Sequence, residues 1–180
     1  MKSVLISIQP KWCELIASGK KTVEVRKTKP KLETPFKCYI YETKDSKYKD
    51  IGVAGHRSDG TPYIFVNAIG KVIGEFVCDA IFPMSILYSN PNDRLALREF
   101  PFTCLSDREI MDYLGNGGDG YGWHISDLVI YDEPRELIEF VKPCNHDNDC
   151  CTCDRYDYIG HRCYNEITRP PQSWCYVEGE

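Results

Sequence analysis

Short apolar stretches separated by turn residues run along this chain, and they constrain its fold more than any other feature. Runs rich in β-branched and aromatic residues indicate strands. We expect strands at residues 3–8, 21–27, 36–43, 70–82, 121–132 and 173–178. We expect helices at residues 9–19, 106–115 and 134–140, and a loop at residues 44–62. Because these elements follow no regular βαβ repeat, their order predicts an α+β fold with a strongly curved or closed sheet.

Residues with known helix-end preferences support the first two helices. Pro10 suits the first turn of a helix, and Gly19 suits the position just past its end. Ser106 and Glu109 have the spacing of a capping box, in which each residue satisfies a main-chain N–H of the other. Both helices are therefore expected to be short and sharply bounded.

Length and composition describe a globular protein. The 180 residues are enough for one domain with an appendage, and 42% hydrophobic with 27% charged residues is ordinary for a folded chain. No stretch has the pattern of a signal peptide or approaches the roughly 18 apolar residues of a membrane span. We therefore expect a cytoplasmic protein without a membrane partner, in which thiols stay reduced.

Charge is distributed unevenly along the chain. Residues 1–50 contain twelve Lys and Arg against six Asp and Glu, whereas residues 51–180 contain ten against twenty-one, for a net charge of −5. This asymmetry predicts a basic working face on an acidic body, which can attract a polyanion locally. The alternative is a solvated lysine-rich surface without a binding role.

The most charged part of the basic segment is residues 21–27, KTVEVRK. In a strand, Val23 and Val25 point to one face, which is the natural core side, and Glu24 and Arg26 point to the other. Two residues along a strand put Glu24 and Arg26 about 6.5–7 Å apart. They form either an exposed ion pair without a function or part of a site.

The run GKKTVEVRK matches the G-x-K-x-x-E-x-R signature of ASCH domains at Gly19, Lys21, Glu24 and Arg26. The segments IQP, GKVIGEF, GWHISDLVIYDEP and PPQSWCYVE are also similar to the small ASCH proteins of bacteria and phages, which belong to the PUA-like superfamily. The resemblance implies a small β-barrel with flanking short helices. It also implies a cleft beside the signature that binds RNA or a modified nucleobase.

The residue chemistry is consistent with a basic cleft for a nucleic acid. Cations of the segment suit phosphate oxygens, and the carboxylate of Glu24 either accepts hydrogen bonds from an exocyclic amine or positions its neighbours. Trp12 and Trp123 are candidate stacking surfaces for a base, with burial in the core as the alternative for each. The candidate binding residues are Gly19, Lys20, Lys21, Glu24, Arg26, Lys27, Trp12, Trp123 and His124.

An enzyme is the alternative reading of the same residues. Some ASCH proteins are amidohydrolases of acetylated cytidine, in which the signature lysine is kept and a threonine nucleophile occupies the place of the signature glutamate. Here Lys21 is present but Glu24 stands at that place, and a carboxylate cannot replace a hydroxyl in the same scheme. A hydrolase acting on RNA or modified nucleosides would use Lys21 and Glu24 as catalytic residues. His124 is either a further general base or a satisfied histidine within a strand.

Five of the ten cysteines lie between residues 144 and 163. Cys150 and Cys153 have a C-x-x-C spacing that lets two thiolates bind one tetrahedral metal. We expect Cys144 and Cys163 to complete a structural zinc site, with Cys151, His146 and His161 as further candidate ligands. Reduced thiols without a metal and disulfides are the alternatives. A zinc-stabilised extension of this kind is also a candidate surface for a protein partner.

These observations divide the chain into three parts. We expect an ASCH, PUA-like domain at residues 1–141, a Cys-rich and zinc-bound insertion at 142–168, and a closing strand packed on the barrel at 169–180. The expected partner is RNA or a modified nucleotide.

Overall fold

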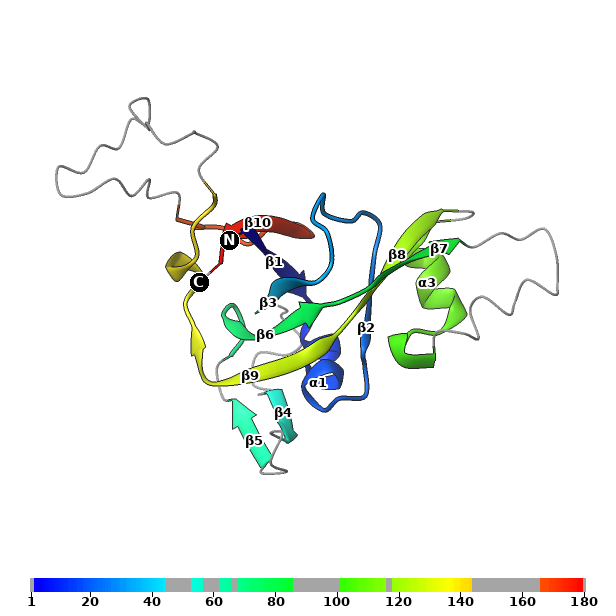
Figure 1. Ribbon diagram of the computed structural model, residues 1–180. Helices are drawn as coiled ribbons and strands as arrows, with labels where there is room; N and C mark the ends of the chain where they lie inside the picture. Colours follow the sequence, from blue (N-terminus) through cyan, green and yellow to red (C-terminus); the bar gives the residue numbers. More distant parts are fainter. Residues whose placement is uncertain are drawn as a thin grey trace, which may run out of the picture.

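A computed structural model of the chain shows a mixed α+β fold made mainly of strands (Figure 1). The structure describes residues 2–44, 53–56, 62–65, 68–85, 101–115, 118–143 and 166–179. The α+β class expected from the order of elements is confirmed for these residues. No helix in these ranges is long and apolar enough to cross a membrane.

The larger sheet has five strands in the order β10-β1-β3-β6-β9. Their bounds are β1 Lys2–Ile8, β3 Phe36–Glu42, β6 Val72–Cys78, β9 Ser126–Arg135 and β10 Trp174–Glu178. β1 runs parallel to β3, and all other neighbours are antiparallel. A parallel pair needs a crossover connection, and here the crossover contains helix α1 (Pro10–Ala17) and strand β2 (Val23–Arg26).

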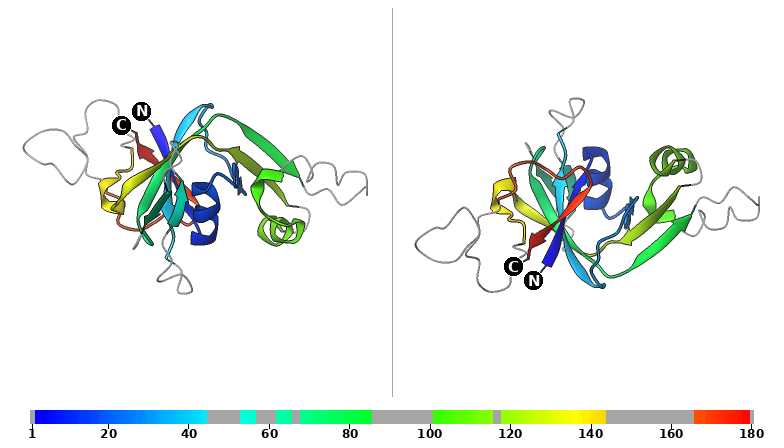
Figure 2. Two further views of the ribbon diagram at one scale, coloured as in Figure 1. Left: turned by 90° about the horizontal axis from the view of Figure 1, so that it is seen from below. Right: turned by 90° about the horizontal axis from the view of Figure 1, so that it is seen from above.

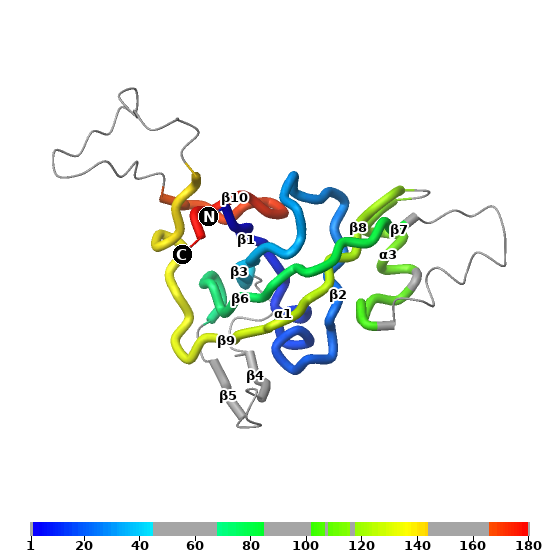
Figure 3. Tube along the Cα trace, viewed as in Figure 1, coloured from blue at the N-terminus to red at the C-terminus, as the bar shows by residue number. Residues whose placement is uncertain are grey.

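A second sheet has three strands in the order β2-β8-β7, with β7 at Ile81–Ser85 and β8 at Asp119–His124. Helix α3 (Asp107–Leu114) lies beside it, and α1 lies between α3 and the five-stranded sheet (Figure 2). Two extended segments pass from one sheet to the other, β6 into β7 and β8 into β9 (Figure 3). The pocket described below lies where these two sheets diverge.

The central strand β1 is buried on both faces, which explains its nearly continuous apolar sequence. On one face Ile6 and Ile8 pack with Cys13 and Ile16 of α1. On the other face the core is formed by Leu5, Tyr39, Tyr41, Val72, Phe140, Ile167 and Val177. The amphipathic helix α1 therefore covers one side of the larger sheet, directly beside the basic segment.

The predicted helix signals of α1 and α3 are confirmed. Pro10 occupies the first turn of α1, and Gly19 follows this helix with a φ of 71°. Ser106 accepts from the main-chain N–H of Glu109, and Glu109 accepts from the main-chain N–H of Ser106, which is the expected capping box.

Three expectations were wrong in detail. The loop expected at 44–62 contains β4 (Val53–His56) and part of a hairpin partner, β5 (Pro62–Phe65). The single strand expected at 121–132 is divided at Ile125 between β8 and β9, which belong to different sheets. The helix expected at 134–140 is the end of β9 followed by a short 3-10 turn at Leu137–Glu139.

A closed β-barrel is not confirmed. In the described ranges the strands form separate sheets of five, three and two strands. The expected zinc ligands Cys144, Cys150, Cys153 and Cys163 lie outside the described residues, as does most of the Cys-rich insertion. Val141, just before this insertion, and Glu166, near its end, pair in an isolated antiparallel bridge.

Candidate functional site

Three charged side chains of the basic segment meet below the surface. Lys21 Nζ lies 3.2 Å from Glu24 Oε2, and Arg26 Nη2 lies 3.0 Å from Glu24 Oε1. Only 1% of Lys21, 6% of Glu24 and 6% of Arg26 is exposed. One carboxylate therefore bridges two buried cations, and the alternative of a solvated Glu–Arg pair is wrong. We call Lys21, Glu24 and Arg26 the ionic triad.

The end of α1 positions the first member of the triad. Gly19 lies in the left-handed region, which strains any residue with a Cβ. The main-chain N–H groups of Lys20 and Lys21 both donate to the carbonyl of Leu15. This tight turn leads the chain from α1 into β2 within a few residues and brings Lys21 beside Glu24.

Strand β2 positions the other two members. Its four residues are all buried, so both faces of the strand lie inside the protein. Val23 and Val25 are each 4% exposed and form the apolar side, as the alternation predicts. Glu24 and Arg26 share the opposite side, where they need partners because an unpaired buried charge is costly.

The ammonium group of Lys21 is surrounded by acceptors. It donates to the carbonyl of Val23 at 2.8 Å and to the carbonyl of Thr103 at 2.7 Å, in addition to its ion pair with Glu24. Three acceptors match the three protons of an ammonium group. These contacts suit a fixed structural cation better than a general base, which needs a free lone pair on nitrogen.

Arg26 connects the triad to β1 and to the segment just before β10. Its Nη2 donates to the carbonyl of Ser7 at 2.6 Å, and its Nη1 lies 3.3 Å from both the carbonyl and the hydroxyl oxygen of Ser173. The Ser7 hydroxyl in turn donates to the carbonyl of Pro171. Two segments far apart in sequence are thus joined by one guanidinium group.

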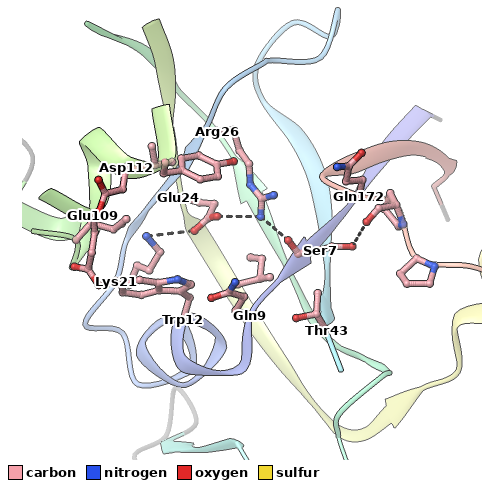
Figure 4. Close-up of a pocket in the computed structure, with 16 residues that line it drawn as sticks. Ser7, Gln9, Trp12, Lys21, Glu24, Arg26, Thr43, Glu109, Asp112 and Gln172 are labelled. Carbon is pink, nitrogen blue, oxygen red and sulfur yellow. Dashed lines mark hydrogen bonds and ion pairs between the residues drawn. The ribbon is translucent and has the colours of Figure 1, made fainter. Parts of the chain in front are cut away.

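The triad faces a pocket of about 700 Å³ (Figure 4). Strands β1 and β2 contribute to it together with α1, α3 and the segment before β10. The lining residues are Ser7, Ile8, Gln9, Trp12, Lys21, Glu24, Val25, Arg26, Thr43, Leu105, Glu109, Asp112, Tyr113, Pro170, Pro171 and Gln172. This volume lies within the range of about 300–1,000 Å³ that is usual for small-molecule sites.

Trp12 supplies the largest flat surface of the pocket. Its indole is partly buried and packs against the main core, and the Nζ atoms of Lys21 and Lys11 lie 5.3 Å and 4.2 Å from its ring. The two alternatives for Trp12 are therefore combined: one residue contributes to the core and also lines the pocket. In Figure 4 it lies on the same side of the pocket as Lys21.

Helix α3 adds carboxylates to the lining of the pocket. Glu109 and Asp112 both line the pocket and are three residues apart on one face of the helix. Hydrogen bonds from the main chain of Ser106 and from the side chain of Lys11 lower the pKa of Glu109 to about 2, so it is ionised. The lining thus has three carboxylates against two cations, and the basic cleft expected from the sequence is not what the pocket shows.

Comparison with known proteins identifies the family. Residues 6–85 match the family model of the ASCH domain, and the signature residues from Gly19 to Arg26 fall within this match. Residues 6–85 of the chain thus carry an ASCH domain. None of the curated proteins matches it.

Solved ASCH structures share the fold. The crystal structure of ASCH from Zymomonas mobilis is 19% identical, covers 98% of this chain and 87% of its own, and superimposes with a TM-score of 0.58. A serine-to-alanine mutant of that protein is 18% identical, covers 98% of this chain and 88% of its own, and has a TM-score of 0.58. A tyrosine-to-phenylalanine mutant is 22% identical, covers 76% of this chain and 77% of its own, and has a TM-score of 0.52. At these sequence identities the similarity shows a shared fold and nothing about function.

Other expected site residues lie away from the pocket of this ASCH domain. Trp123 is 0% exposed and packs edge-on against Phe36 in the core, so it offers no surface for stacking. His124 pairs with Asp79 at 2.6 Å and does not line the pocket. Trp123 is therefore a core residue, and His124 is a histidine whose hydrogen bond is satisfied within the fold.

The remaining lysines are at the surface. The side chains of Lys20 and Lys27 are exposed and do not line the pocket. Lys27 is nevertheless at its edge, because its Nζ lies 5.4 Å from the ring of Tyr113, a lining residue. The charges of residues 20–27 thus separate into the buried ionic triad, which lines the pocket, and the exposed Lys20 and Lys27.

Sequence reasoning missed the pocket residues that come from other elements, chiefly Gln9, Glu109, Asp112, Tyr113 and Gln172. The helix carrying three of them was predicted, and its spacing places Glu109 and Asp112 on one face. Which element that face approaches depends on the packing of α3, and no local pattern reports this. No group of three or more metal-ligating side chains occurs in the part of the chain that the structure describes.

Proposed function

We propose that this ASCH domain is a nucleic-acid-binding module whose pocket receives one base of RNA or a modified nucleobase. The ASCH domain belongs to a PUA-like family that is generally associated with RNA binding. The proposal is supported by the chemistry of the pocket, in which an aromatic ring and a buried carboxylate lie within one cavity.

The juxtaposition of Trp12 and Glu24 is the observation that carries the proposal. Aromatic rings bind bases by stacking, without regard to sequence, and a carboxylate accepts hydrogen bonds from a base edge. Lys21 and Arg26 hold the carboxylate from both sides, so its position is fixed before a ligand enters. Such preorganisation lowers the entropy cost of binding.

Exposed lysines around the pocket complete the proposal. Lys27 lies beside Tyr113 at the pocket edge, and Lys20 follows α1 directly. Cations in these places can contact phosphates of a chain whose base enters the pocket, because phosphate contacts position a nucleic acid without reading its sequence.

The test is the substitution of Trp12 by alanine. Loss of stacking is expected to weaken binding of a fluorescently labelled single-stranded RNA by about 5- to 150-fold, which corresponds to about 1–3 kcal/mol. Trp12→Phe keeps an aromatic face and should retain most of the affinity. Anisotropy titrations of both variants, with far-UV circular dichroism to show that each is folded, make the comparison.

An RNA affinity that is equal in Trp12→Ala and the unmodified protein would contradict the proposal, because it would place the nucleic acid elsewhere on the surface. Trp174 provides a matched control. It is a partly buried tryptophan of β10, it donates to the Thr28 hydroxyl, and it does not line the pocket. Trp174→Phe is expected to leave RNA affinity within about twofold, because a residue outside the pocket contributes little to binding.

A further inference from the structure

The charged groups of the pocket differ in how many contacts they can still make. Lys21 has three acceptors within 3.2 Å, which equals its number of protons. Both terminal nitrogens of Arg26 face two acceptors each, in Ser7, Ser173 and Glu24. The terminal nitrogens of Lys21 and Arg26 are thus committed to the protein, whereas Arg26 Nε is buried and has no hydrogen-bond partner in the described part of the chain.

Glu24 is in the opposite situation. Each of its oxygens has one cationic partner, whereas an ionised carboxylate has about four lone-pair positions. It lines the pocket and remains slightly exposed there. The ionic triad, which forms the floor of the pocket, therefore offers a ligand more hydrogen-bond acceptors than donors.

The part of the lining that α3 contributes has the same character. Asp112 is exposed and lines the pocket, and its Oδ2 is 3.9 Å from Arg108, a pair with 90% and 76% of the side chains exposed. Glu109 is also ionised, although Lys11 and Ser106 occupy its oxygens. A phosphate in this pocket would meet carboxylates on two sides, and like charges in proximity are unfavourable.

We propose that the pocket selects nucleobases that present an exocyclic amine, with Glu24 as the acceptor, and that it leaves the phosphate outside. This inference rests on the proposed function, because it specifies the base that the same pocket takes. An amine donates to the free positions of the carboxylate. A carbonyl at the same place on the base would direct its oxygen against the carboxylate and leave both groups without a donor, which a buried site penalises.

Two pairs of nucleosides test this difference directly. Cytidine and uridine, and likewise adenosine and inosine, differ at the exocyclic position by an amine in place of a carbonyl. We expect cytidine and adenosine to bind at least about tenfold more tightly than uridine and inosine, as is typical for a well-made polar contact to a base edge. Isothermal titration calorimetry of the full chain measures all four.

The phosphate is tested with cytidine 5′-monophosphate. If it stays outside the pocket, its affinity should lie within about threefold of that of cytidine, and the ratio should change little with salt because few counterions are released. An increase of tenfold or more on adding the phosphate would overturn this part of the proposal.

Glu24→Gln tests the residue itself, because glutamine keeps the size but can present an amide N–H as well as an oxygen. The preference for cytidine over uridine is expected to fall to within about threefold. If the variant does not fold, the four nucleosides on the unmodified protein still decide the base preference. Glu33→Gln is the matched control: it removes an exposed carboxylate outside the pocket and should keep the preference for an amine.

Outcomes separate this inference from the proposed function. Tight binding of RNA or nucleosides with no difference between amine and carbonyl bases would overturn the inference and keep the proposed function. Binding of neither RNA nor any of the four nucleosides would overturn both.

Discussion

Glu24 and Glu42 are both buried carboxylates, yet their surroundings differ completely. Glu24, in β2, is bridged by Lys21 and Arg26. Glu42, at the end of β3, is 1% exposed, and neither of its oxygens has a hydrogen-bond partner in the described part of the chain. Burial raises the pKa of Glu42 to about 7, so this carboxyl accepts a proton readily.

The difference shows two ways in which a protein accommodates a buried carboxyl group. At the pocket floor Glu24 keeps its negative charge because Lys21 and Arg26 pair with it, and the result is a fixed acceptor that faces a ligand. At the end of β3 the group takes up a proton, and no charge needs a partner. A retained charge indicates a role that requires it, and this supports the assignment of Glu24 rather than Glu42 to the binding site.

The largest effect is expected on removing the paired carboxylate. Glu24→Ala leaves Lys21 and Arg26 as buried cations without an anion, and breaking a buried ion pair in this way costs about 3–5 kcal/mol in the free energy of unfolding. Urea denaturation measures the loss. The exposed Glu33→Ala is the control and should change stability by less than about 0.5 kcal/mol. A loss below about 1 kcal/mol for Glu24→Ala would mean that the triad is not energetically coupled.

An opposite and smaller effect is expected for the unpaired carboxyl. The folded pKa of Glu42, about 7, is above its ordinary value of 4.5, so the folded state binds more protons between these values. The free energy of unfolding therefore falls as pH rises from about 4.5 to 7, because ionising the buried Glu42 destabilises the folded state. Above pH 7 this loss reaches its full size, up to about 3 kcal/mol. Glu42→Gln should be more stable than the unmodified protein at pH 8, and this advantage should disappear near pH 4.

Denaturation of both proteins between pH 4 and 8 gives the difference directly. Groups with a lowered pKa, such as Glu75 and Glu109, contribute slopes of the opposite sign but are common to both proteins. If the difference in unfolding free energy between Glu42→Gln and the unmodified protein were the same at every pH, Glu42 would not be the titrating group.

The smallest effect concerns the exposed neighbours of the triad. Replacing Lys20 and Lys27 together by glutamine should change the free energy of unfolding by less than about 1 kcal/mol, because exposed charges and a surface cation–π contact contribute little. The same double variant should reduce the salt dependence of RNA affinity, since phosphate contacts release counterions. A large loss of stability would show that these lysines, like Lys21, belong to the framework.

Much of the architecture was predictable because its signals are local. Pro10 and the Ser106–Glu109 capping box define helix starts through contacts within a few residues. The alternation of Val23 and Val25 predicted the apolar face of β2 correctly. The division of residues 121–132 between two sheets was not predictable, because it depends on which distant strands β8 and β9 pair with.

The site was predictable only in part for a similar reason. The signature correctly brought Lys21, Glu24 and Arg26 together, since these residues are close in sequence. Local charge counting, however, predicted a basic cleft, because it could not include the carboxylates of α3 that tertiary packing brings to the same cavity. Burial of Trp123 likewise follows from the packing of β8 between β2 and β7 rather than from its neighbours in sequence.

The pairing of β10 with β1 has a consequence for how the chain matures. Lys2 to Ile6 of β1 pair with Glu178 to Trp174 of β10, and Gln172 and Ser173 just before β10 complete the pocket and the acceptors of Arg26. During synthesis on the ribosome, β1 and the whole triad emerge long before these partners exist. A nascent chain therefore lacks these pocket residues and these acceptors of Arg26 until β10 has been synthesised and has paired with β1.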